Sequence, residues 1–210
     1  MIKINKLNIS IVLIWLFTIS GIIGILSPVY SSWFLKLTPL NLSVMFGLFL
    51  WNLKEINNQT FIALSIPFFL GFITEFLGVN YGFIFGDYTY GENLGVKIWG
   101  VPIIICINWA LLTAITSKLS THYFKNRLLA PLVGAFLMTL LDAIIEVSAP
   151  KFDFWEFEGG IVPLQNYVGW FFIALISHIG YQYFNVQASL KITWHIWCSM
   201  FLFFTFFLFF

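Results

Sequence analysis

Long apolar segments alternate with short polar ones along almost the whole chain. A membrane-spanning helix needs about 20 predominantly apolar residues, and seven segments meet or approach that length. The second segment is short, so its helix either begins nearer Ser31 or is tilted or re-entrant. The pattern predicts an all-α, polytopic membrane helix bundle of about seven transmembrane helices. The segments are Ile9–Leu26, Leu40–Leu53, Phe61–Val79, Trp99–Ser117, Leu128–Ser148, Tyr167–Phe184 and Ile192–Phe210.

The composition agrees with lipid as the main solvent. Hydrophobic residues occupy 60% of the 210 positions, charged residues occupy 9%, and the mean hydropathy is +0.92. Soluble domains carry about 25% charged residues. We therefore expect one integral membrane domain over residues 1–210, surrounded by membrane lipid. The net charge of +1 gives no electrostatic case for binding nucleic acid.

Lysine and arginine positions predict the orientation, because these residues are enriched in cytoplasmic segments of membrane proteins. With the N-terminus in the cytoplasm, seven of the ten basic residues are cytoplasmic and three are outside. We therefore predict an N-in, C-out topology. The first apolar run is too long for the core of a signal peptide, so we expect a retained helix. The cytoplasmic set is Lys3, Lys6, Lys54, Lys118, Lys125, Arg127 and Lys191, and the outer set is Lys36, Lys97 and Lys151.

Two predicted outer loops differ from plain connectors, which are usually short and polar. They cover Asn80–Ile98 and Ala149–Gln165, and both are rich in aromatic residues, glycines and acids. Loops of this length and composition are long enough to fold over a site.

Three of the nine acidic residues lie within predicted helices, namely Glu75, Asp142 and Glu146. A carboxyl near the bilayer centre costs about 2.5–3.5 kcal/mol on insertion scales, so such residues are functional candidates by default. Asp142 and Glu146 are four residues apart, which puts both on one helix face. In the predicted topology all three lie toward the outer leaflet. The alternative is that they anchor lipid head groups or make hydrogen bonds between helices.

Buried carboxyls beside aromatic rings suit one kind of chemistry. Burial and a neighbouring carboxyl both favour the neutral, protonated acid, and aromatic faces stabilise cations. An acid in an apolar, aromatic-walled pocket is therefore suited to protonating an alkene in a lipid substrate.

Other polar residues have simpler interpretations. His178 and His195 are a pair of helix histidines that can ligate haem or a metal. Nothing else in the sequence supports ligation, so hydrogen-bonded interfacial histidines are the preferred interpretation, and we predict no metal and no cofactor. Asn108 fits a hydrogen bond between helices as well as a substrate contact. Trp170 at a helix end is typical of an interfacial aromatic belt, whereas Trp155, in an acidic, glycine-rich loop, is a candidate to cap a pocket.

Two stretches carry a family resemblance. Gly71 to Trp109 combines a helix glutamate with Phe-Gly-x-Tyr-x-Tyr, Leu-Gly and Gly-Val-Pro, and Leu141 to Trp170 combines a helix aspartate with Gly-Gly, Val-Pro-Leu and Asn-Tyr-x-Gly-Trp. In this order the motifs resemble the carotenoid biosynthesis membrane-protein family that contains the carotenoid 1,2-hydratases. The resemblance covers about a third of the chain. The matched positions are Glu75, Asp87, Tyr88, Tyr90, Asp142, Trp155, Asn166 and Trp170.

The resemblance implies cofactor-independent hydration of the terminal C1=C2 double bond of an acyclic ψ end group, as in lycopene or γ-carotene. It also implies a carotenoid substrate, a bacterial or archaeal cell membrane, and other carotenoid enzymes as partners. Glu75 and Asp142 are then the expected acid/base pair. Asp87 and Glu146 are second choices, and Glu146 lies where the family's sequence varies more. The expected substrate-binding residues are Tyr88, Tyr90, Asn108, Trp155, Asn166 and Trp170.

Three alternatives remain open at the level of sequence. A lycopene-cyclase-type enzyme also begins by protonating a terminal alkene, and only the fate of the cation differs. A small proton-coupled transporter would use intramembrane acids as a relay. A third alternative is a non-catalytic scaffold for pigment enzymes.

Overall fold

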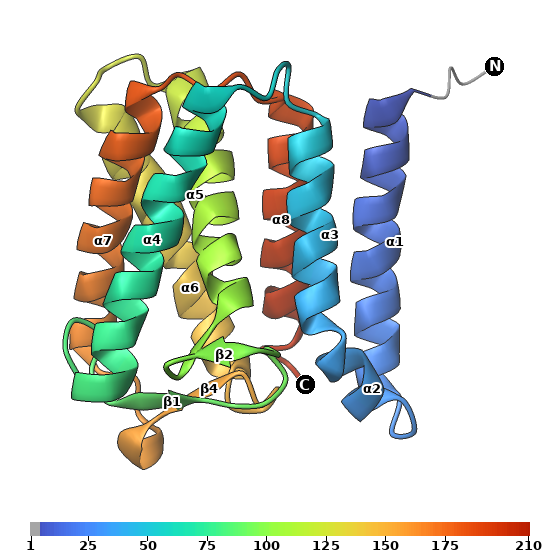
Figure 1. The fold of residues 1–210 in the computed structure, drawn as a ribbon. Coiled ribbons are helices and arrows are strands. Elements are labelled where there is room, and N and C mark those ends of the chain that lie inside the picture. The colour runs from blue at the N-terminus through green and yellow to red at the C-terminus, as the bar shows by residue number, and fades with distance from the viewer. Residues whose placement is uncertain (1–4) are drawn as a thin grey trace.

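The computed structural model describes residues 5–210 as an upright bundle of eight α-helices with short strands at one end (Figure 1). The helices run roughly parallel to one another, and the N-terminal end of α1 lies opposite the end that carries the strands. The helices are α1 Lys6–Leu26, α2 Ser31–Lys36, α3 Thr38–Trp51, α4 Asn58–Tyr81, α5 Ile103–Tyr123, α6 Leu129–Ser148, α7 Leu164–Tyr183 and α8 Leu190–Phe206. The strands are β1 Tyr88–Tyr90, β2 Lys97–Ile98, β3 Val101–Pro102 and β4 Trp155–Phe157, followed by the 3₁₀ turn η1 Glu158–Gly160.

Helix α5 forms the centre of the bundle and contacts α3, α4, α6, α7 and α8. Most of its residues from Ile104 to Ser120 are buried. Helix α1 lies at the periphery and packs mainly on α8, α2 and α3. It leaves Val12, Leu16, Ile19 and Ile23 exposed at helical spacing. Because these apolar side chains form a stripe that faces outward, this face of α1 is suited to contact with lipid.

Within residues 5–210, four helices are long and apolar enough by length and composition to cross a membrane, namely α1, α4, α5 and α6. They indicate an integral membrane protein. Helices α3 and α8 are apolar but shorter, and α7 has 20 residues but includes Asn166, His178 and Gln182. Each predicted segment corresponds to one of the helices other than α2. The helix of the second segment, α3, begins at Thr38 rather than nearer Ser31, since a turn at Leu37 separates it from the short helix α2. Seven spans and the N-in, C-out topology stay predictions, and Lys3 lies outside the described residues.

The prediction that a helix begins at Trp99 was wrong. Strands β2 and β3 pair as an antiparallel hairpin around Trp99 and Gly100, and α5 begins only at Ile103. Both turn residues have positive φ, 50° for Trp99 and 86° for Gly100. Two such residues in succession are typical of the tight turns that match strand twist. The turn at Gly100 and the strand β3, which ends at Pro102, therefore prevent α5 from beginning before Ile103.

The two long loops pair with each other, which the all-α prediction did not anticipate. Strand β1 of the first loop lies antiparallel to β4 of the second, with Tyr88 opposite Phe157 and Tyr90 opposite Trp155. Successive side chains of a strand point to opposite faces. The aromatic residues therefore share the face toward the helices, while Thr89 and Glu156 point away and are exposed.

Helix α4 has local signals at both ends that place the first loop. The side chain of Asn57 caps its start by accepting from the backbone N–H of Thr60 at 2.9 Å. Gly82 ends it in the left-handed conformation, with φ 65°. A Cβ at Gly82 would lie 2.2 Å from Asp87 Oδ1. The glycine thus lets the chain turn sharply under the helix end and return as β1.

Candidate functional site

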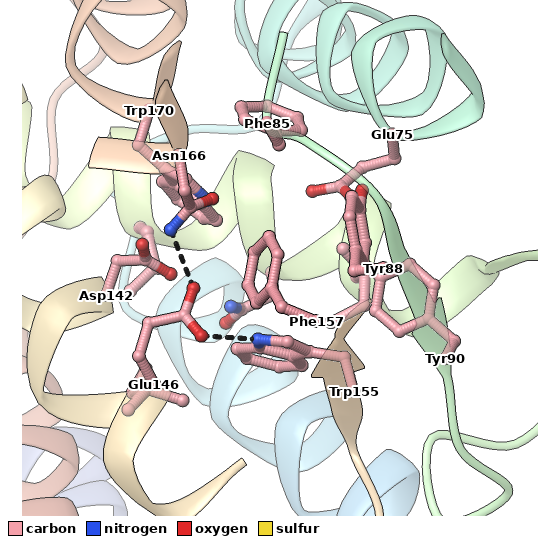
Figure 2. A pocket seen from close by; sticks show the side chains of 14 residues that line it. Glu75, Phe85, Tyr88, Tyr90, Asp142, Glu146, Trp155, Phe157, Asn166 and Trp170 are labelled. Atoms are coloured by element: carbon pink, nitrogen blue, oxygen red, sulfur yellow. Dashed lines mark hydrogen bonds between the residues drawn. The ribbon is translucent and has the colours of Figure 1, made fainter. Parts of the chain in front are cut away.

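A pocket lies at the strand end of the bundle, between α4, α5, α6 and α7 and beneath the β1–β4 pair (Figure 2). All three carboxyl groups predicted to lie within helices line it, Glu75 from α4 and Asp142 and Glu146 from α6. Each of these residues is at least 96% buried, since their exposed fractions are 2%, 1% and 4%. The free space for the centre of a water molecule is about 30 Å³, which suffices for one or two waters.

Glu75 is surrounded by hydrogen-bond donors. Its Oε2 accepts from the hydroxyls of Tyr88 and Tyr90, the latter at 2.7 Å, and its Oε1 accepts from the indole N–H of Trp109 at 2.9 Å. Burial, and after it the charge of Glu75, raises the pKa of Tyr88 and Tyr90 well above the ordinary value of a tyrosine. Both phenols therefore keep their protons and serve as donors. Glu75 is thereby held rigidly as an acceptor.

The two carboxyls of α6 have different surroundings. Glu146 accepts from the indole N–H of Trp155 and from the amide of Asn166, each at 2.8 Å. Asp142 lies one helical turn before it, and the two side chains approach each other in Figure 2. The Oδ2 atom of Asp142 is buried without a hydrogen-bond partner among residues 5–210. An unpaired buried polar atom costs about 1–3 kcal/mol, so Asp142 has unused hydrogen-bonding capacity inside the pocket.

Aromatic rings form the walls around these acids. Trp109 and Trp170 are stacked with ring centroids 4.3 Å apart and planes 15° apart. Phe85 lies 6.1 Å from Trp170 and 6.4 Å from Trp109 between centroids, and Phe157 lies 5.2 Å from Tyr88. A pocket with carboxyls and ring faces at this density is suited to holding a carbon cation, because ring faces attract positive charge.

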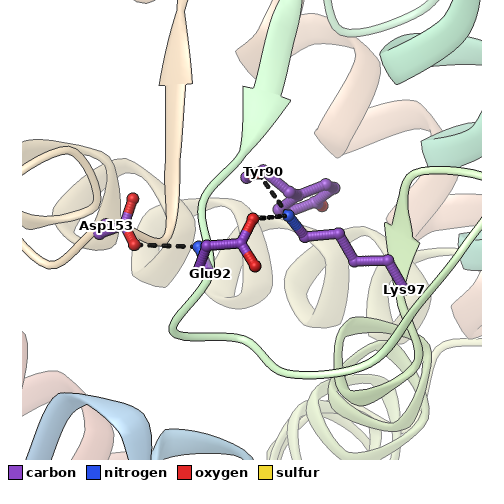
Figure 3. A network of polar contacts seen from close by, with 4 residues as sticks. All are labelled: Tyr90, Glu92, Lys97 and Asp153. Atoms are coloured by element: carbon purple, nitrogen blue, oxygen red, sulfur yellow. Dashed lines mark hydrogen bonds and ion pairs between the residues drawn. The ribbon is translucent and has the colours of Figure 1, made fainter.

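A polar network fixes the loop that carries β1 (Figure 3). The ammonium of Lys97 contacts Glu92 Oε1 and the backbone carbonyl of Tyr90, both at 2.9 Å. Asp153 Oδ2 accepts from the backbone N–H of Glu92 at 2.9 Å and so joins the two loops. These contacts fix the backbone at Tyr90 and Glu92, at the end of β1.

The structure brings nine of the ten candidate residues to one pocket. Glu75, Asp142 and Glu146 face it together with all six expected substrate-binding residues, which are Tyr88, Tyr90, Asn108, Trp155, Asn166 and Trp170. Asp87 is the exception. Its side chain is exposed and lies in a shallow depression on the outer face of the strands, beside Thr89 and Glu156. The assignment of Asp87 as a second-choice catalytic residue therefore loses its geometric support.

The interpretation of Trp170 as an interfacial residue was wrong. Its exposed fraction is 9%, it lines the pocket, and it stacks on the fully buried Trp109. Trp109 itself was missed as a site residue, although it ends the first resembling stretch. A tryptophan needs a partner for its N–H when buried, so an indole in the middle of an apolar helix was the available signal. Phe85 and Phe157 were also missed, and a strand pattern in the loops would have been needed to find them.

The two helix histidines are hydrogen-bonded, as the simpler interpretation predicted. His178 contacts Thr116 Oγ1 at 2.8 Å and the carbonyl of Ala174 at 2.7 Å, and His195 accepts from the indole of Trp15 at 2.9 Å. Across residues 5–210, no group of three or more histidine, cysteine or acidic side chains is arranged as metal ligands would be.

Comparisons with known proteins agree with the family resemblance. The model of the family described as carotenoid biosynthesis protein matches residues 11–210. Bisanhydrobacterioruberin hydratase of Haloarcula japonica is 25% identical over 168 residues, which cover 70% of this chain and 56% of that protein. The match thus spans little more than half the length of this relative. No solved structure matches the chain.

Proposed function

The chain belongs to the carotenoid biosynthesis protein family, and from that premise we propose that it hydrates the terminal double bond of an acyclic carotenoid. The substrate is a polyene with a ψ end group, and the product is a tertiary 1-hydroxy carotenoid. The name of the Haloarcula japonica relative, a hydratase, supports this reaction class. The observation that carries the proposal is the unpaired Oδ2 of Asp142 in an aromatic-walled pocket that holds two further carboxyls.

Asp142 is the proposed proton donor. Its buried Oδ2 accepts nothing from the described residues, so a protonated Asp142 can direct its O–H toward a bound alkene. The proton goes to C2, the less substituted carbon, and the electron pair of the double bond forms the new C–H bond. The positive charge then lies on C1, which is tertiary. General acid catalysis of this kind contributes about 10²–10⁴-fold to a rate.

The cation is stabilised by charge and by rings. Glu75 accepts hydrogen bonds from Tyr88, Tyr90 and Trp109, and in this role it supplies a fixed negative charge facing C1. The rings of Phe85, Phe157 and Trp170 line the same pocket and can attract the positive charge. This assignment makes Glu75 an electrostatic partner rather than one half of the acid/base pair expected from the sequence.

Water completes the reaction at C1. The pocket has room for one or two water molecules, and the amide oxygen of Asn108, buried and without a partner in the described chain, is available to accept a hydrogen bond from one of them. The water oxygen bonds to C1 and releases a proton to Glu146. Because Glu146 is one turn from Asp142 on α6, it can return that proton and restore the starting state. The sum is one alkene and one water giving one alcohol.

Pigment analysis tests the proposal. Membranes that contain the protein are incubated with preformed lycopene in ordinary water, heavy water or ¹⁸O-labelled water, and the pigments are then separated by chromatography and analysed by mass spectrometry. Hydration predicts a 1-hydroxy product whose hydroxyl oxygen comes from water and whose C2 carries a hydrogen from solvent. Matched membranes that contain Asp142→Asn at equal protein level are the control.

Each alternative leaves a different record in this experiment. A cyclase would give a product with the mass of lycopene and no oxygen label. A transporter or scaffold would leave the pigments unchanged. Either of those results would overturn the hydratase proposal.

A further inference from the structure

A second cavity adjoins the acid pocket at the same end of the bundle. It lies between α1, α3 and α8 on one side and α5 and α6 on the other, and Leu94 and Phe154 of the two loops also line it. Its free space for the centre of a water molecule is about 80 Å³, larger than that of the acid pocket. The two cavities share four lining residues, Ile105, Asn108, Ile145 and Trp155. They are therefore neighbours across a common wall.

The lining of the second cavity is mainly apolar. Met45, Met200, Phe203 and Phe204 contribute flexible thioethers and rings, side chains that adapt to an irregular apolar ligand. The hydroxyl groups there donate to backbone carbonyls: Thr18 to that of Ile14 at 2.7 Å, Thr38 to that of Leu35 at 2.7 Å, and Ser199 to that of Ile196 at 2.8 Å. These hydroxyls therefore do not require a polar ligand.

Two amide oxygens in this cavity are unpaired. The Oδ1 atoms of Asn41 and Asn108 are buried with no hydrogen-bond partner among the residues described. Most buried polar atoms in proteins are paired, but unpaired atoms such as Ser177 Oγ and Tyr181 Oη also lie outside both cavities, so these two amides alone do not indicate a ligand. Apolar walls with a few convergent polar groups are typical of ligand cavities. The apolar lining and the wall shared with the acid pocket thus give the second cavity the properties of a binding site for an apolar chain.

The cavity is extended along the helices. Its lining includes Thr18 and Ile25 on α1, seven residues apart, and Thr38 and Met45 on α3, also seven apart. At 1.5 Å per residue each pair spans about 10 Å. A space of this length between helices fits a chain better than a compact molecule. The peripheral α1, whose outer stripe is apolar and exposed, separates the cavity from the surrounding lipid.

We propose that this second cavity holds the polyene chain of the substrate directly behind the end group that reacts. This inference depends on the proposed function, because it treats the two cavities as one site. The end group lies among Glu75, Asp142 and Glu146, the chain passes the shared wall at Asn108 and Trp155, and it then runs between α1, α3 and α8. The substrate class is an elongated acyclic isoprenoid, and the second cavity selects for chain length.

A cavity-filling variant tests this. Leu42→Trp narrows the cavity from α3, and Leu40→Trp makes the same change at a side chain that is 52% exposed. Purified proteins are assayed with lycopene and with a short acyclic isoprenoid alcohol that has the same terminal alkene. We expect Leu42→Trp to lower the hydration rate of lycopene by about tenfold or more, which corresponds to a tenfold loss of substrate affinity. The short substrate should react as in the unaltered protein, and Leu40→Trp should change neither rate.

Two outcomes of that assay would overturn the inference. One is unchanged hydration of lycopene by folded Leu42→Trp. The other is an equal loss with both substrates, because the variant would then act on the acid pocket rather than on the chain.

A binding measurement covers the case in which Leu42→Trp does not fold or the protein does not hydrate lycopene. In a Cys106→Ser, Cys198→Ser background, Thr18→Cys places a thiol on the cavity wall and Ile19→Cys places one on the exposed face of α1. Added lycopene should slow maleimide labelling of Thr18→Cys by about tenfold and leave Ile19→Cys unchanged. Equal labelling of Thr18→Cys with and without lycopene would exclude the polyene from the cavity. Protection without turnover would keep the chain site and reject the hydratase proposal.

Discussion

His178 and Asp142 are two titratable residues buried to almost the same extent in one bundle, at 0% and 1% exposure, but their surroundings differ. Both ring nitrogens of His178 have partners, in Thr116 and Ala174, and Gly134 packs so closely that a Cβ there would lie 2.3 Å from the imidazole Cδ2. Asp142 instead faces a pocket with one oxygen unpaired.

This difference separates a structural polar group from a candidate for chemistry. The fold satisfies His178 completely, so the residue connects α7 to α5 and has no remaining donor or acceptor. Asp142 retains capacity that only a water, a substrate or a proton can use. Burial of a polar residue in a membrane helix is thus insufficient to indicate a site, and an unpaired carboxyl oxygen that faces a pocket is what distinguishes Asp142 from His178.

The largest expected effect is the loss of pigment conversion on substitution of Asp142. Asp142→Asn keeps the shape and removes the transferable proton, so we expect pigment conversion to fall by about 10²–10⁴-fold at an unchanged melting temperature. Conversion and detergent melting curves are measured on the same preparation. Undiminished 1-hydroxy product from Asp142→Asn would reject this residue as the proton donor.

A second test removes the charge of Glu75. Glu75→Gln replaces an acceptor of hydrogen bonds from Tyr88, Tyr90 and Trp109 with a neutral amide, and we expect a rate loss of about 10²-fold, as for other preorganised electrostatic groups. Glu156→Gln makes the same change on the exposed outer face of β4 and should have no effect. Equal rates for the two variants would remove Glu75 from the mechanism.

Substitution of His178 should lower the stability of the protein rather than its turnover. His178→Gln disrupts two buried hydrogen bonds, and leaving such partners unpaired costs about 1–3 kcal/mol. We expect a lower melting temperature and less folded protein, with unchanged turnover per folded molecule. A turnover loss at the temperature where the variant is fully folded would show that the two ends are coupled.

The smallest effect is expected at the loop network. Lys97→Met removes the contacts to Glu92 and to the carbonyl of Tyr90, but Glu92 is 85% exposed and exposed ion pairs contribute only about 0–1 kcal/mol. We expect KM for the polyene to rise by about twofold through a less fixed Tyr90, with kcat unchanged. Lys151→Met, at an exposed loop lysine without an ion-pair partner in residues 5–210, is the control. A large fall in kcat would mean that Lys97 does more than hold the loop.

Much of the helical framework was predictable because membrane helices are encoded locally. A run of about 20 apolar residues needs a helix to satisfy its backbone in lipid, so the predicted segments correspond to α1 and α3–α8. Asp142 and Glu146 were placed on one face by their spacing alone. The β1–β4 pair was not predictable in this way, because its partners are more than 60 residues apart and short loop strands leave a weak pattern.

The sequence by itself determined that the chain is an integral membrane protein, which segments form its long helices, and which acids are buried, because length and hydrophobicity decide these. Only the tertiary structure decided which buried acid keeps an oxygen without a hydrogen-bond partner. Glu75 acquires Tyr88 and Tyr90 from one loop and Trp109 from another helix, Asp87 turns outward with the strand, and Asp142 keeps an unpaired oxygen. The physical reason is that hydrogen-bond partners come from segments distant in sequence, and their arrangement depends on how the helices and loops pack.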